Sequence, residues 1–123
     1  MHTPSTHHRP YQKLVVWREA HSLCLYIYKR TARFPSYEKS ALVNQMRTAA
    51  YSVPTNLAEG TGKKSPKERN RFFEYASCSL EELHYQCFLS RDLGYIAADE
   101  FTKVELHIGR VGYLLMRLRS TLN

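Results

Sequence analysis

Two short stretches of the chain carry residue types that bind phosphate or metal, but neither has the spacing that such chemistry requires. The first, Gly62-Lys63-Lys64-Ser65, is similar to the end of a nucleotide-binding P-loop. It lacks the earlier glycine of that motif, has Lys64 where Ser or Thr is needed, and follows a predicted helix instead of a strand. The sequence therefore argues against nucleotide hydrolysis.

The second stretch is Glu81-x-x-His84, which is half of the ligand set that di-iron helix bundles use. A complete site needs a second Glu-x-x-His pair. Glu105-Leu106-His107 instead directs its two side chains to different faces of a helix. We therefore expect no metal ion and no other cofactor.

Nucleophilic catalysis would depend on the three cysteines, Cys24, Cys78 and Cys87. Their spacing brings none of them toward His21 or His84, and no glycine loop that could stabilise an oxyanion is near them. We expect no catalytic residue, and a protein that is not an enzyme. The odd number of cysteines, without a CxxC pair or a secretory signal, is typical of reduced thiols in a cytoplasmic protein.

The balance of charge is informative about partners. Eighteen Lys and Arg against eleven Asp and Glu give a net charge of +7 and an isoelectric point near 9.5. An excess of this size favours an anionic partner such as nucleic acid. No apolar run approaches the ~20 residues that cross a bilayer, so we expect no membrane partner.

Apolar residues recur every three or four positions in four blocks, which predicts four amphipathic helices. The four stripes run from Trp17 to Phe34, from Leu42 to Leu57, from Phe72 to Leu93 and from Phe101 to Leu122. Short connections favour antiparallel neighbours. The predicted fold class is therefore all-α, an up-down-up-down four-helix bundle over residues 13–123, after a disordered lead-in over residues 1–12.

Local signals predict where these helices begin and end. Pro35 ends the first helix, and Ser36 suits the N-cap of the second. Gly60 is expected to end the second helix in a left-handed conformation. Ser65-Pro66-Lys67-Glu68 forms a capping box that begins the third, and Gly94 stops it.

Pro54 lies inside the second block and predicts a kink, because it has no N–H and its ring crowds a carbonyl. We expect the hydroxyl of Ser52 or Thr55, or a water, to satisfy the freed carbonyl. Asn56 and Glu59 follow closely. They can cap the kinked helix, bond across a subunit boundary or line a channel, and the structural roles rank first.

An antiparallel bundle gathers the start of the first and third helices and the end of the second and fourth at one pole. Ten basic and two acidic residues fall there, a net +8, against +1 at the other pole and −2 in the middle. Glycines and lysines before the third helix also suggest a phosphate site at its N-terminus. The residues predicted to bind nucleic acid are Lys63, Lys64, Lys67, Arg69, Arg71, Arg117, Arg119 and Arg18.

Eight aromatic residues lie beside the apolar stripes instead of on them. On a four-helix bundle they would leave exposed apolar patches, and Tyr and Phe are favoured in protein interfaces. We therefore expect self-association. The residues predicted at the oligomer interface are Tyr26, Tyr51, Phe73, Tyr85 and Tyr113.

Four segments of the chain carry a resemblance to a known family: LVVWREA (14–20), Phe34-Pro35 followed by Glu38, QMRTAAYSVPTNLAEG (45–60) and FFEYASCSLEELHYQCFLSRDLGYI (72–96). The most specific part is SVPTNLAEG, residues 52–60. These segments resemble the four-helix bundle proteins encoded in the intervening sequences of bacterial 23S rRNA genes, whose fold is shared by accessory variability proteins of diversity-generating retroelements. Cys78 is a small departure, since members often carry Gly before the following Ser.

This resemblance implies a homopentamer of four-helix bundles around a central channel. It also implies an association with nucleic acid, since the similar retroelement proteins assist a reverse transcriptase and bind nucleic acid. The predicted function is a non-enzymatic adaptor that holds phosphate backbones, of RNA or DNA, on its basic pole. The alternative is a scaffold whose basic pole docks a polymerase, such as a reverse transcriptase, or a ribonucleoprotein, without contacting nucleic acid itself.

Overall fold

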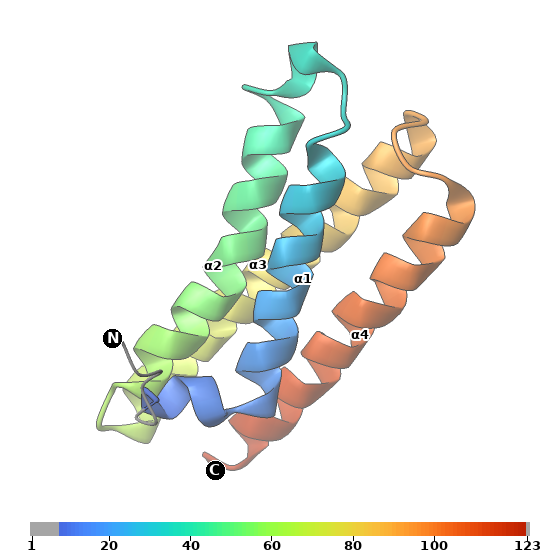
Figure 1. Cartoon of the computed structure of the whole chain (residues 1–123). Coiled ribbons are helices and arrows are strands. Elements are labelled where there is room, and N and C mark those ends of the chain that lie inside the picture. The colour runs from blue at the N-terminus through green and yellow to red at the C-terminus, as the bar shows by residue number, and fades with distance from the viewer. Residues whose placement is uncertain (1–7, 123) are drawn as a thin grey trace, which may run out of the picture.

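The computed structural model describes residues 8–122 and consists of four antiparallel helices (Figure 1). No strand occurs within these residues. The predicted all-α four-helix bundle is therefore confirmed. The helices are α1 (Val15–Thr31), α2 (Leu42–Thr61), α3 (Pro66–Asp92) and α4 (Ala98–Ser120), with short 3-10 helices η1 (Pro10–Lys13) and η2 (Ser36–Glu38) before α1 and α2.

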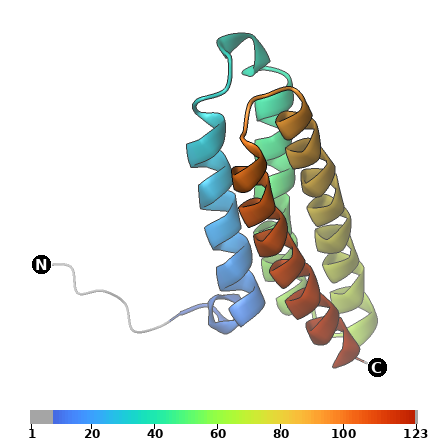
Figure 2. The same ribbon diagram turned by 90° about the vertical axis from the view of Figure 1, so that its right-hand side faces the viewer.

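Each helix packs against two neighbours, in the order α1, α2, α3, α4 and back to α1, and the most extensive contact is between α2 and α3. The connections are short, so chain direction alternates around the bundle (Figure 2). The start of α1, the α2–α3 connection and the end of α4 consequently lie at one end of the molecule. We call this end the basic pole. No helix in the described part of the chain is long and apolar enough to span a membrane.

The core is built from one inward stripe on each helix, and the stripes of α1, α2 and α4 follow the predicted positions. Trp17 at the start of the first stripe is only half-buried, because Val16 takes the inner position. The largest side chains with almost no exposure are Leu23, Ile27, Met46, Val53, Leu57, Leu83, Val111 and Leu115.

The inward stripe of α3 differs from the prediction at its first residue, which is Phe73 instead of Phe72. Phe73 is 2% exposed and begins a buried series through Ala76, Leu80 and Leu83, at steps of three and four. Phe72, the residue expected on this stripe, is half-buried at the surface. The prediction that Phe73 lies at an oligomer interface is therefore wrong, because it packs inside the protomer.

Gly60 explains why Phe73 can turn inward. It lies within α2 instead of ending it in a left-handed conformation, so that prediction is wrong. A Cβ atom at Gly60 would stand 2.6 Å from Cε1 of Phe73 and 3.1 Å from the carbonyl oxygen of Arg69. The glycine thus lets α3 approach the backbone of α2. Gly94, with φ of 81°, does end α3 as predicted.

α2 continues as one helix through Pro54. The hydroxyls of Ser52 and Thr55 each donate to the carbonyl four residues earlier, at 2.7 Å, so neither serves the carbonyl of Ala50 that Pro54 leaves free. The prediction that one of these hydroxyls satisfies the carbonyl of Ala50 is therefore wrong. Asn56 donates in the same way to Ser52 O at 2.8 Å, which is a structural role within the helix.

The start of the second helix and the end of the lead-in also differ from the prediction. Ser36 does not cap α2; it begins η2, and α2 starts only at Leu42. The predicted lead-in, residues 1–12, falls largely on residues 1–7, which lie outside the described residues. Its last residues, Pro10 to Gln12, instead belong to η1, and Tyr11 packs edge-on against Trp17 with ring centroids 5.0 Å apart.

At the pole opposite the basic pole, Arg30 of α1 joins the beginning of α4. Its guanidinium pairs with both carboxylate oxygens of Glu100, at 2.7 and 2.9 Å, and donates to the carbonyl of Tyr95 at 3.0 Å. Glu100 also accepts the N–H of Ala97 at 2.9 Å. These hydrogen bonds, first from Arg30 and then from Ala97, lower the pKa of Glu100 to about 2.

Replacing Gly60 with Ala tests the contact between α2 and α3. Overpacking against Phe73 costs about 1–3 kcal/mol, and the better helix propensity of Ala offsets about 1 kcal/mol of it. We expect the free energy of unfolding in urea to fall by up to about 2 kcal/mol. At Gly112 a Cβ would meet Leu80 at an ordinary 3.5 Å, so Gly112→Ala is the control and should stabilise. Equal effects at the two glycines would contradict the packing described here.

Replacing Glu100 with Gln tests the Arg30 pair. The folded pKa of about 2 lies below the ordinary 4.5, so the carboxylate stabilises the fold above about pH 4.5 and this contribution is lost as the pH falls toward 2. We expect Glu100→Gln to lower the free energy of unfolding at neutral pH, and the difference from wild type to shrink across that window. Glu74→Gln, at an exposed position, is the control. A deficit that does not change with pH would contradict the pairing.

Candidate nucleic-acid interface

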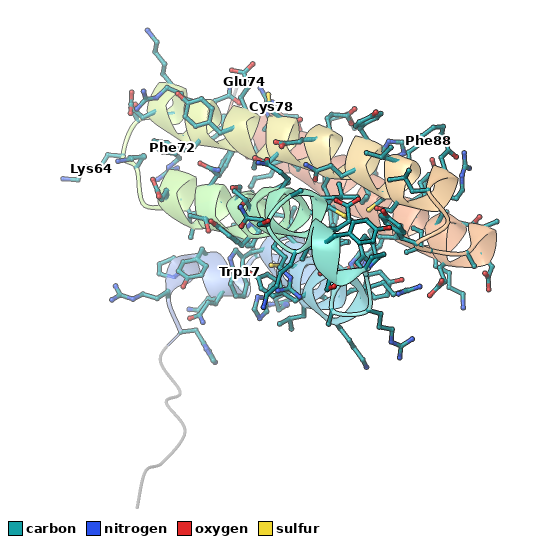
Figure 3. The ribbon with its side chains drawn as sticks, turned by 90° about the horizontal axis from the view of Figure 1, so that it is seen from above. Trp17, Lys64, Phe72, Glu74, Cys78 and Phe88 are labelled. Atoms are coloured by element: carbon teal, nitrogen blue, oxygen red, sulfur yellow. The ribbon has the colours of Figure 1, made fainter. Side chains whose placement is uncertain are left out.

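The α2–α3 connection and the first turn of α3 place two lysines at the tip of the basic pole. Lys64 and Lys67 are exposed, and neither makes an ion pair or side-chain hydrogen bond with any residue in 8–122. Figure 3 shows Lys64 extending away from the bundle. Two ammonium groups are therefore presented to the solvent without a carboxylate partner among the described residues.

Phe72 gathers two further cations beside them. The ammonium of Lys63 lies 5.0 Å, and the guanidinium of Arg71 5.1 Å, from the centre of its ring. Such cation–π contacts hold flexible side chains in place while they remain accessible. Arg71 also pairs with Glu68 at 3.0 Å. Because Phe73 fills the core, Phe72 is free for this surface role, which the sequence pattern did not indicate.

Arg69 and Arg119 hold the pole together from half-buried positions. Nε of Arg69 donates to the carbonyl of Lys63 at 2.7 Å and so fixes the α2–α3 connection. Nε of Arg119 donates to Oδ1 of Asn70 at 2.9 Å and so ties the end of α4 to α3. Both residues keep their positive charge at the pole, but their first role is structural.

Arg18 and Arg117 complete the predicted set and are exposed. Arg18 donates to the carbonyl oxygens of Gln12 and Lys13, at 3.4 and 3.2 Å, at the end of η1. Arg117 donates to the hydroxyl of Tyr113 at 3.0 Å. The structure therefore brings all eight predicted cations to one end of the bundle, on the start of α1, the α2–α3 connection, the first turns of α3 and the end of α4.

The predicted phosphate site at the N-terminus of α3 offers few backbone donors. Pro66 has no N–H, Oγ of Ser65 accepts the N–H of Glu68 at 3.1 Å, and the N–H of Lys63 bonds to the carbonyl of Gly60 at 3.1 Å. Gly60 also belongs to α2 instead of to the loop. Anion binding at this pole would therefore rest on side chains.

Ion pairing differs between the two ends of the bundle. Among residues 8–122, the ion pair at the basic pole is Arg71–Glu68. At the opposite pole, Arg30 pairs with Glu100 and Arg91 with Asp92 at 3.2 Å. Two of the six cations at the opposite pole are paired in this way, and five carboxylates there nearly balance the six positive charges, whereas the excess at the basic pole is not balanced.

The other residues considered for chemistry are dispersed. His84 lies 3.0 Å from Glu105, and no group of three or more His, Cys, Asp or Glu within residues 8–122 could hold a metal ion. Burial raises the pKa of Cys87 to about 12 and also raises that of Cys24, which disfavours their thiolates. Cys78 is exposed.

Of the residues predicted at an oligomer interface, Tyr51, Tyr85 and Tyr113 are exposed, and Tyr26 is half-buried against the core. The structure adds two apolar residues on the outward face of α4, Leu106 at 70% and Met116 at 58% exposure. The sequence pattern that could have indicated this face is the i, i+3, i+7, i+10 spacing of Leu106, Gly109, Tyr113 and Met116. This spacing places the four residues on the side of α4 opposite the core stripe.

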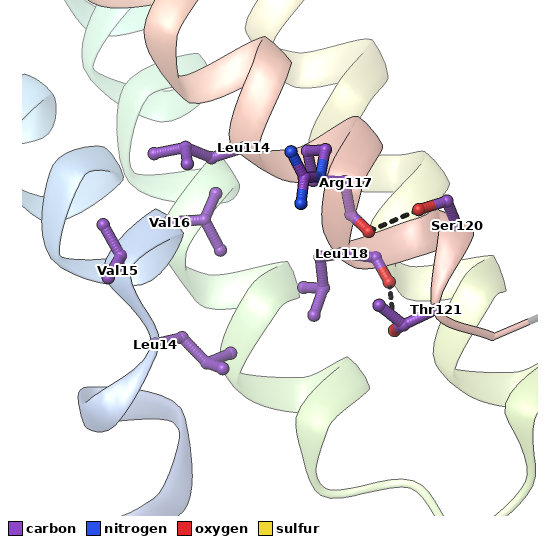
Figure 4. A pocket seen from close by; sticks show the side chains of 8 residues that line it. All are labelled: Leu14, Val15, Val16, Leu114, Arg117, Leu118, Ser120 and Thr121. Atoms are coloured by element: carbon purple, nitrogen blue, oxygen red, sulfur yellow. Dashed lines mark hydrogen bonds between the residues drawn. The ribbon is translucent and has the colours of Figure 1, made fainter.

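A hollow of about 310 Å³ lies at the basic pole between the start of α1 and the end of α4 (Figure 4). Its walls include Leu14, Val16 and Leu118. The hydroxyls of Ser120 and Thr121 at its rim donate to backbone carbonyls, at 2.7 and 2.6 Å. The hollow is mainly apolar and offers a phosphate little beyond Arg117.

Comparison with known proteins agrees with this architecture. The model of the 23S rRNA-intervening sequence protein family matches residues 12–117, from η1 to the last turns of α4. A search of curated proteins finds no significant match. The matched range covers most of the 123 residues and all four helices, so the chain belongs to the 23S rRNA-intervening sequence protein family.

Proposed function

We propose that the protein is a non-enzymatic adaptor that binds the phosphate backbone of RNA or DNA through its basic pole. The observation that carries this proposal is the unequal distribution of charge between the two poles. Ten basic and two acidic residues lie at the basic pole, and Lys64 and Lys67 stand exposed at its tip. A polyanion would displace the counterions that such a surface gathers, so binding would weaken steeply with salt.

The chemistry of the pole favours contact with the backbone over recognition of base edges in a duplex. Its exposed cations are Lys64 on the α2–α3 connection, Lys67 in the first turn of α3 and arginines near helix ends, which reach phosphates at many orientations. The proposed binding to duplexes is therefore independent of sequence.

Self-association is the second part of the proposal, with the homopentamer as the form that the family resemblance implies. It is supported by the outward face of α4, where Leu106, Tyr113 and Met116 are more than half exposed at 70%, 52% and 58%. Gly109 lies among them with open space around its Cβ position. A glycine there costs helix stability of about 1 kcal/mol in the protomer and would allow another chain to approach closely. In a cyclic assembly the basic poles would all face the same side.

Reversing the charge of the two free lysines tests the proposed binding. We expect the double variant Lys64→Glu, Lys67→Glu to bind a labelled RNA hairpin about tenfold or more weakly at low salt. The slope of log affinity against log salt should also become shallower, by about 0.7–0.9 for each phosphate that the variant no longer neutralises. Fluorescence anisotropy at several salt concentrations measures both quantities.

The matched control is Lys39→Glu, Lys103→Glu, which changes the net charge equally at two exposed positions of the opposite pole. It should bind nearly as well as wild type. Equal weakening in the two double variants would mean that total charge, not the basic pole, decides binding. Absence of any binding at low salt would reject the proposal. It would favour the alternative, a scaffold that docks a polymerase or ribonucleoprotein. In that case the protein would still capture this partner after nuclease treatment.

Leu106→Glu tests the proposed association face. Leu106 is 70% exposed in the protomer, so the substitution should leave its thermal unfolding nearly unchanged. In an interface it would bury an unpaired carboxylate, and we expect sedimentation velocity to show smaller species. Ala32→Glu, an exposed position near the opposite pole, is the charge-matched control. An unchanged sedimentation coefficient for Leu106→Glu would contradict the assignment of this face.

A further inference from the structure

An aromatic groove of about 430 Å³ lies between α1 and α2 beside the basic pole, and backbone binding makes no use of it. One wall comes from η1 and the first turns of α1, and the other from α2. Its lining includes four rings, Tyr11, Trp17, His21 and Tyr51, together with Pro54 and Glu59. This density of aromatic side chains at the surface needs an explanation.

The rings of one wall form a contiguous cluster in which two of the three are stacked. The rings of Trp17 and His21 lie 5.0 Å apart with an interplanar angle of 9°, and Tyr11 meets Trp17 edge-on at 5.0 Å. Tyr51, on the opposite wall, is 45% exposed. A flat aromatic molecule that enters between these walls would find stacking partners that are already ordered, so little conformational entropy would be lost on binding.

The groove is connected to the basic pole. A second hollow, of about 240 Å³, is lined by Arg9, Thr61 and Gly62 and shares Tyr11 and Ala58 with the groove. It leads along the end of α2 to the connection that carries Lys63 and Lys64. A strand whose phosphates lie on the pole could therefore reach the groove with its next bases.

The charges around the groove favour a base over a phosphate. Glu59 is the carboxylate in its lining; it would repel a phosphate but would accept a hydrogen bond from the exocyclic amino group of a base. Its remaining walls are mainly apolar and aromatic, which suits the face of a base. The cationic residues lie next to the groove instead of inside it.

We propose that this groove holds an unpaired base of a nucleic-acid strand whose backbone lies on the basic pole. The inference rests on the proposed nucleic-acid function and adds a preference for single-stranded segments. Bases in a duplex are stacked on each other and cannot enter a groove between two helices. Stacking on aromatic side chains accepts every base and therefore requires no reading of sequence.

Trp17 is the single tryptophan of the chain and so reports directly on the groove. We expect an oligocytidine RNA to quench its fluorescence on binding, and the same RNA annealed to its complement to bind without quenching it. Tyr51→Ala should weaken binding of the single strand about tenfold and leave binding of the duplex unchanged. Tyr37→Ala, at an exposed tyrosine of η2 outside the groove, is the matched control and should change neither.

The outcomes separate this inference from the function on which it rests. Equal binding of single strand and duplex, without quenching, would overturn the inference and leave backbone binding intact. Failure of both RNAs to bind at low salt would overturn both. If Tyr51→Ala produces smaller species in sedimentation and Trp17 is never quenched, a second copy of the chain covers the groove and the inference is wrong.

Discussion

The contact between Gly60 of α2 and Phe73 of α3 is the constraint on which the surface of this bundle depends. It allows the two helices with the most extensive mutual contact to approach until a Cβ on Gly60 would stand 2.6 Å from the phenyl ring. With Phe73 inside, the helical period turns Phe72 to the surface beside the α2–α3 connection. Phe72 then positions Lys63 and Arg71 at the basic pole. Packing in the core thus determines how the cations are displayed.

The two poles of the bundle make different use of charge. At one end, Arg30 and Glu100 satisfy each other and hold the start of α4 to α1. At the basic pole, Arg69 and Arg119 donate their hydrogen bonds to the carbonyl of Lys63 and the amide oxygen of Asn70, and only Glu68 there pairs with a cation among the described residues. Repulsion among like charges opposes folding at this pole. The protomer therefore bears a local electrostatic cost that a polyanion would relieve.

Helix number, direction and most of the core could be predicted from the sequence, because a period of three and four residues encodes one buried face without reference to any partner. The errors arose where two interpretations satisfy the same local pattern. Phe72 and Phe73 both fit a helical stripe, and a glycine such as Gly60 serves equally to end a helix or to admit a neighbour. The aromatic groove, formed by Tyr11, Trp17 and Tyr51 from separate elements, depends on tertiary packing that no local spacing encodes.

Charge and assembly are physically linked in the proposed ring. Cyclic symmetry would place every basic pole on the same side, so repulsion between neighbouring poles would add to the repulsion within each protomer. A bound nucleic acid would reduce both, and would therefore favour the assembled state over free protomers by mass action. The outward face of α4, with Leu106 and Gly109, lies away from the groove between α1 and α2, so association through α4 would leave the groove open. Binding and association would then reinforce each other through electrostatics alone, with no change in the fold of the protomer.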